Sequence, residues 1–98
     1  MRKEPVFQTG TIVVTRGVGD LMEKEERFRL FVGISLSRYV EGDFGEICKE
    51  DAKTNAEALK NGERLMGVYK CPGLSEWDIW IITEWDRSVT TILFPEEY

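Results

Sequence analysis

The sequence predicts one α+β domain with the order β-α-α-β-β-β, in which two helices pack on one face of a three- to four-stranded, mainly antiparallel sheet. Three observations predict this fold. A chain of 98 residues has the size of a single domain, and its 42% hydrophobic content is typical of a packed globule. Apolar residues at helical spacing occupy the first half of the chain. Short apolar segments joined by tight turns occupy the last third, and such links favour antiparallel neighbours.

The first strand and the first helix are predicted from local patterns. Residues 10–15 are rich in β-branched side chains and lie between glycines, which is typical of a strand. Asp20, followed three residues later by Glu23, resembles a capping box and predicts a helix start. Apolar residues then recur at helical spacing as far as Tyr39, so this helix should end before Gly42.

A second helix is predicted from Glu50 to Asn61, with Gly62 as the first residue beyond it. Its expected inward stripe consists of Ala52, Ala56 and Leu59. Asn55 borders that stripe, so we expect a half-buried amide that needs hydrogen-bond partners.

Three strands should follow, over residues 64–70, 78–83 and 89–94, with turns at 71–75 and 84–88. Together with the first strand they make up the sheet. Because the links between these three strands are short, they should form an antiparallel meander.

The strand at residues 78–83 has apolar side chains on both faces, with Ile79 and Ile81 on one side and Trp80 and Ile82 on the other. Two helices can cover only one face of a small sheet. The face that carries Trp80 should therefore be covered by the N-terminal arm, by a second subunit or by a partner.

Residues 1–9 are expected to form this arm, and residues 10–98 the single domain. No segment approaches the roughly 20 apolar residues of a membrane span, and no signal peptide is visible, so we expect a cytoplasmic protein without membrane contact. Cys48 and Cys71 match no metal or redox spacing and should be reduced thiols.

The acidic residues are concentrated in two segments of the chain. The net charge is −5, with six acids against two lysines in residues 41–57 and six acids against Arg87 alone in residues 75–98. Direct binding to nucleic acid requires Lys and Arg and is therefore disfavoured. Acidic segments favour basic partners, although solubility alone explains a charge of this size.

The residue types give no sign of a catalytic centre, a metal site or a cofactor. Histidine is absent, which removes the commonest general base and metal ligand. Neither cysteine has a histidine partner, and no phosphate-binding or dinucleotide motif occurs. Arg38, Arg64 and Arg87 could hold an anion or a phosphate, but a structural role is favoured, with Arg64 paired to Asp43 or Asp86.

Three segments resemble a group of small bacterial proteins labelled plasmid-related. These segments are Arg38–Gly45, the run from Asn55 to Arg64, and the C-terminal stretch Trp80–Tyr98, which contains Trp-Ile-Ile-Thr, Asp-Arg-Ser, Thr-Thr-Ile-Leu and Pro-Glu-Glu-Tyr. The resemblance implies a plasmid or phage context and no particular reaction. Members of the group carry histidine where this chain has Tyr39 and tryptophan where it has Phe44.

These observations lead to one main hypothesis, a non-enzymatic protein of a plasmid or phage that binds and modulates a host protein. In its sharpest form it is an anti-CRISPR-like inhibitor, whose acids mimic phosphates in a basic nucleic-acid-handling enzyme such as a Cas nuclease. The expected partner-binding residues are Asp43, Glu46, Glu50, Asp51, Glu84, Asp86, Arg87 and Trp80.

Two alternatives are open. One is a small nuclease or toxin in which Arg64, Tyr69, Arg87 and Thr90 would bind a phosphate, an idea that rests on fold analogy alone. The other is an accessory domain that forms a homodimer through an exposed face of the sheet.

Overall fold

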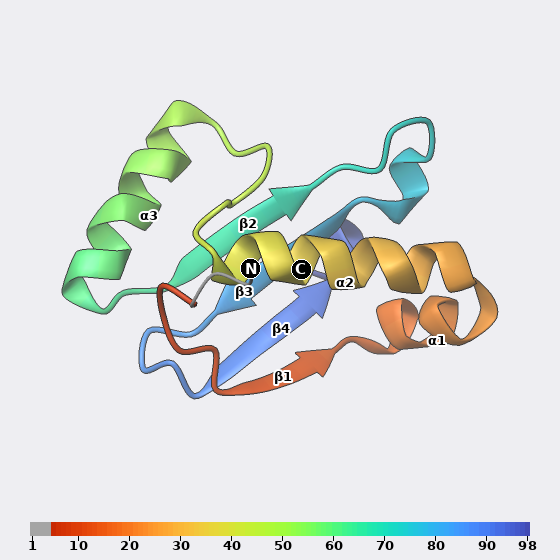
Figure 1. Cartoon of the computed structure of the whole chain (residues 1–98), viewed down its shortest axis with the longest axis horizontal. Helices are drawn as coiled ribbons and strands as arrows, with labels where there is room; N and C mark the ends of the chain where they lie inside the picture. Colours follow the sequence, from red (N-terminus) through yellow and green to blue (C-terminus); the bar gives the residue numbers. More distant parts are fainter. Residues whose placement is uncertain (1–4) are drawn as a thin grey trace.

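The computed structural model describes residues 5–98, which form three α-helices and one four-stranded sheet (Figure 1). The α+β fold is therefore confirmed. The elements are β1 (Thr11–Val14), α1 (Arg16–Lys24), α2 (Glu26–Val40), α3 (Lys49–Asn61), β2 (Leu65–Tyr69), β3 (Ile79–Thr83) and β4 (Val89–Leu93). Single turns of 3-10 helix span Ser75–Trp77 and Pro95–Glu97.

The sheet has the order β1-β4-β3-β2. Strands β2, β3 and β4 form the antiparallel meander that their short links predict. Strand β1 adds to β4 in parallel, with Thr11 opposite Val89 and Val14 opposite Ile92. The chain can make this parallel pair because three helices and two strands separate β1 from β4.

Helix α2 crosses one face of the sheet, and the core lies between the two (Figure 1). Phe28 and Val32 of the helix are buried together with Ile81 and Ile92 of the sheet. Helix α1 packs beside α2, whereas α3 lies next to the β2 edge.

The predicted single helix over residues 20–39 is wrong in one respect, because two helices meet at Glu25. This residue is extended, with φ −124° and ψ 106°. Helix α1 also begins earlier than predicted, since Thr15 and not Asp20 is its N-cap and accepts from the Val18 amide. The carboxylate of Glu97 fixes this start, because it accepts hydrogen bonds from Thr15 Oγ1 and the Gly17 amide.

Helix α3 ends as predicted, at a Gly62 in the left-handed region (φ 69°). Its inward face was predicted incorrectly. Asn55 and Ala58 are buried, while the expected stripe is exposed. The three residues of that stripe are Ala52, Ala56 and Leu59. Asn55 faces inward because its side-chain amide forms hydrogen bonds with the backbone of Met66 at the edge of β2.

The described part of the N-terminal arm packs on the helix-bearing side and does not cover Trp80, contrary to one of the expectations. The carbonyl of Thr9 accepts a bond from the buried Thr90 hydroxyl, and the Phe7 ring lies 5.1 Å from that of Tyr39. On the opposite face, the Tyr98 ring lies 5.4 Å from Trp80. Part of that face is thus covered by the C-terminal residue of this chain.

Candidate functional site: an acidic edge beside strand β2

The outer edge of β2 is closed by two sets of hydrogen bonds. The Asn55 side chain donates to the Met66 carbonyl (2.7 Å) and accepts from the Met66 amide (3.2 Å). Two residues further along, the Glu46 amide donates to the Val68 carbonyl, and the Val68 amide donates to Phe44. The expectation that Asn55 is a buried amide with partners is confirmed, and α3 and the loop before it are both fixed to the sheet.

Gly45 makes this attachment sterically feasible. Its φ is +74°, and a Cβ at this position would lie 1.9 Å from the Val68 carbonyl oxygen. A glycine is therefore required for the loop to run this close to β2. The consequence is that Glu46, the next residue, is placed at the strand edge.

The two acidic segments of the sequence meet beside this edge. Glu46, from the first segment, and Asp78, from the second, both line a cleft of about 540 Å³ at the turn between β2 and β3. One oxygen of Asp78 accepts from the Cys71 amide at 2.9 Å. Burial raises the pKa of the Cys71 thiol, and the nearby charges of Asp78 and Glu76 raise this pKa further.

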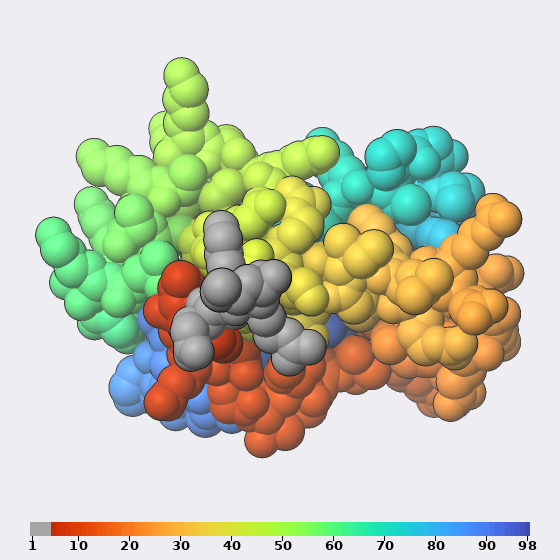
Figure 2. Space-filling view, in the orientation of Figure 1, coloured from red at the N-terminus to blue at the C-terminus, as the bar shows by residue number. Residues whose placement is uncertain are grey.

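Three of the predicted acids are exposed and form no ion pair in the described chain, although Lys70 lines the cleft with Glu46 and Arg64 lines a smaller hollow with Asp51. Glu46, Glu50 and Asp51 are solvent-exposed, and no basic group of residues 5–98 lies within 4.0 Å of their carboxylates. They follow one another from the β2 edge into the first turn of α3, the helix that projects from the body of the molecule in Figure 2. We call Glu46, Glu50, Asp51 and Asp78 the acidic edge.

The other predicted acids bond within the chain. Arg38 binds Asp43 through two hydrogen bonds of 2.8 and 3.2 Å, which lower the pKa of that carboxyl. Asp86 accepts from the amide and the hydroxyl of Ser88, and these bonds lower its pKa as well.

Arg64 pairs with neither of the acids expected for it. Its guanidinium lies 3.9 Å from Glu84 and donates to the Tyr98 hydroxyl at 2.9 Å. The prediction of Asp43 or Asp86 as its partner is therefore wrong. Glu84 directly follows β3, whose last residue, Thr83, pairs with Leu65 at the start of β2, and this brings Glu84 beside Arg64.

Arg87 holds α3 against the β3–β4 turn. Its guanidinium donates to the carbonyls of Ala58, Glu63 and Glu84, at 3.2, 2.6 and 3.1 Å. The residue has φ +60°, the one positive value outside glycine in the described chain. Trp80 is in register with Val68 of β2 and lies on the sheet face that Tyr98 partly covers.

The four residues of the nuclease alternative do not share a surface. Tyr69 and Thr90 are fully buried, and the Tyr69 hydroxyl donates to the Asp43 carbonyl. Arg87 is bound to backbone carbonyls, and Arg64 lies on the side of Tyr98. A phosphate could not contact all four without rearrangement of the core.

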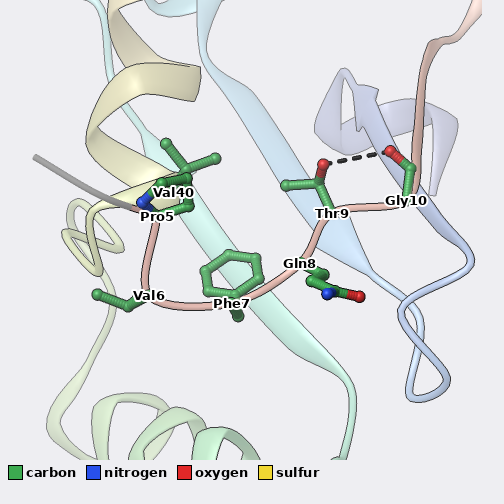
Figure 3. Close-up of a pocket in the computed structure, with 7 residues that line it drawn as sticks. All are labelled: Pro5, Val6, Phe7, Gln8, Thr9, Gly10 and Val40. Carbon is green, nitrogen blue, oxygen red and sulfur yellow. Dashed lines mark hydrogen bonds between the residues drawn. The ribbon is translucent and has the colours of Figure 1, made fainter. Parts of the chain in front are cut away.

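A second hollow, beside the N-terminal arm, offers little chemistry (Figure 3). It has a volume of about 540 Å³ and is lined by residues 5–10 and Val40. Its polar side chains are those of Gln8 and Thr9, and the Thr9 hydroxyl donates to the Gly10 carbonyl. None of these lining side chains titrates.

Within residues 5–98, no group of three or more acidic or cysteine side chains is arranged to hold a metal ion, and no helix has the length and hydropathy needed to cross a membrane. The two thiols of that region are not bonded to each other. Comparison of the chain with protein-family models, curated proteins and solved structures gave no match.

Proposed function

We propose that this chain is a non-catalytic binding protein that presents its acidic edge to a basic surface of a partner protein. One observation carries the proposal. Acids from two separate segments of the sequence converge beside β2, and Glu46, Glu50 and Asp51 form no ion pair within 4.0 Å in the described chain. Such a surface attracts basic proteins and steers their approach.

The way in which this edge is held supports the proposal. A binding surface is more effective when its groups are fixed before the partner arrives, because less conformational entropy is lost on association. The bonds from Asn55 to Met66 and from the loop to Val68 fix the backbone that carries Glu46 and the start of α3.

A narrower form of the proposal comes from the plasmid-related resemblance. The partner would then be a cytoplasmic enzyme that handles nucleic acid, such as a Cas nuclease, and the acidic edge would take the place of phosphates in its groove. In that case an RNA or DNA oligonucleotide should compete with this chain for the partner.

A pair of matched variants tests the proposal. The first reverses three acids of the edge, as E46K/E50K/D51K. The second, E23K/E25K/E26K, makes the same change in net charge at the junction of α1 and α2, at the opposite end of the molecule (Figure 1). Each variant places two lysines at a helix N-terminus, at residues 50 and 51 of α3 or at residues 25 and 26 of α2, so both carry this cost in helix stability.

Both variants and the wild type would be used as bait in nuclease-treated bacterial lysate, after circular dichroism has established that each is folded. We expect a basic protein that the wild type and the junction variant capture and that the edge variant loses. Equal capture of this protein by all three would contradict the role of the acidic edge. If both variants lose it equally, the binding depends on net charge and not on the position of the acids.

A further inference from the structure

The two edge strands of the sheet, β2 and β1, differ in whether other parts of the chain cover their outer side. The β2 edge is closed by Asn55 and by the loop at Gly45. Strand β1, at the other border of the sheet in Figure 1, has no such cover from the described residues. All four of its residues are exposed, and Ile12, Val13 and Val14 keep 44%, 39% and 40% of their surface accessible.

The hydrogen bonds of β1 to β4 determine which of its backbone groups point outward. The Thr11 amide donates to the Ser88 carbonyl, and the Thr15 amide donates to the Ile92 carbonyl. Backbone groups of alternate residues face opposite sides of a strand. Residues 11, 13 and 15 therefore face β4, and the N–H and C=O groups of Ile12 and Val14 face away from it.

We propose that β1 pairs with β1 of a second copy of this chain, antiparallel and about a two-fold axis at Val13. In this register Ile12 of one copy and Val14 of the other exchange both of their outward N–H···O=C bonds. The axis repeats the pair, so four backbone bonds form and the two sheets join into one of eight strands. The interface is isologous, the commonest form in homodimers.

The side chains of β1 suit this pairing. Neighbouring β-branched residues across antiparallel strands stabilise a sheet, and the register places Ile12 beside Val14 and Val13 beside Val13. Natural sheet edges avoid such pairing by means of charges, prolines or bulges, and Thr-Ile-Val-Val contains none of these.

The distribution of charge along the chain is also compatible with the approach of a second copy at β1. Arg16 is the one charged residue between positions 5 and 19, so the net charge of −5 originates elsewhere in the chain. In the proposed register, Arg16 of one copy lies opposite Gly10 of the other. Gly10 abuts the backbone of Arg87 and Ser88, so Asp86 is roughly two strand spacings, about 10 Å, from the incoming Arg16 backbone. In the single chain the Arg16 guanidinium is 95% exposed and lies 4.0 Å from Asp20, its one acid partner among residues 5–98, so it is free to reach across this distance.

Cysteine cross-linking tests the register directly, in a background in which Cys48 and Cys71 are serine. Val13 on the axis is a non-hydrogen-bonded pair, with an expected Cα–Cα distance of about 4.5 Å that a disulfide can span. Val13→Cys should therefore give a covalent dimer on mild oxidation. Thr11→Cys is the matched control, because it is exposed on the same strand face but lies roughly 14 Å from its own copy. Equal cross-linking of the two variants, or none in either, would overturn the register.

Light scattering tests the association itself. The wild type should have twice the chain mass of 11.3 kDa. Val13→Asp should have the single mass, since it places two carboxylates together on the axis. Leu30→Asp changes an exposed residue of α2 and should remain dimeric. A wild type with the mass of one chain at high concentration, or a dimer that survives Val13→Asp, would overturn the proposal. The acidic edge is not part of this interface, so neither result bears on the proposed function.

Discussion

Replacement of Asn55 by alanine should destabilise the protein by about 2–4 kcal/mol. The change removes two hydrogen bonds to Met66, each worth about 0.5–1.5 kcal/mol net. It also leaves a half-buried amide and carbonyl at the sheet edge without a protein partner, which adds about 1 kcal/mol or more. A domain of this size is stable by about 5–15 kcal/mol, so the expected loss is a large fraction of the total.

The assay is urea unfolding followed by tryptophan fluorescence and by far-ultraviolet circular dichroism. Thr54→Ala is the matched control, because Thr54 is the exposed neighbour of Asn55 and bonds only within α3. It should change the free energy of unfolding by less than about 0.5 kcal/mol. Hydrogen exchange should also accelerate at the Met66 amide in Asn55→Ala. If the two variants prove equally stable, the claim that Asn55 closes the β2 edge is wrong.

Three further predictions concern single side chains. Arg87→Ala should cost about 2–3 kcal/mol in urea unfolding, because a charged donor to three carbonyls is lost, and Arg87→Lys should recover little of it; full stability of Arg87→Ala would contradict this. Burial raises the pKa of Tyr39 to about 12, so its contribution to stability is present below pH 10 and is lost as the pH rises towards 12. Tyr39→Phe should weaken the alkaline loss of stability, and an unchanged pH profile would count against the assignment. Arg38 lowers the pKa of Asp43, so the stability from this pair is present above about pH 4 and is lost as the pH falls below it. Asp43→Asn should reduce that acid loss, and identical acid profiles would refute the pairing.

The sequence predicted the strands of the sheet well because their signals are local. Each observed strand lies within one residue of its predicted bounds at either end, since β-branched runs and the flanking turns define them. The end of α3 was also predictable, because Gly62 is a residue that readily adopts positive φ.

The incorrect expectations depend on contacts between distant parts of the chain. Thr15 caps α1 with help from Glu97, and no pattern near residue 15 indicates that carboxylate. The break at Glu25 has no glycine or proline to mark it. Hydrophobicity alone favours an exposed Asn55. It faces inward because its amide forms a hydrogen bond with the Met66 carbonyl at the edge of β2.

The candidate site was predictable in part. The acids were evident in the sequence, but their intramolecular partners were not. Arg38 lies five residues from Asp43, while Glu84 forms an ion pair with Arg64, which precedes β2 and is 20 residues away in the sequence. The sequence could not indicate that Glu46 and Asp78 share a cleft, because the bridge of Gly45 to Val68 brings them together.

The most direct test of the acidic edge is the affinity of a purified, captured partner for this chain, measured by titration calorimetry between low and high salt. The wild type and E23K/E25K/E26K should bind with similar affinities that fall as salt rises, because exposed charges are screened beyond about 8 Å at physiological ionic strength. E46K/E50K/D51K should bind at least tenfold more weakly and with a smaller dependence on salt. If this variant binds like the wild type over the whole salt range, the acidic edge is not the binding surface.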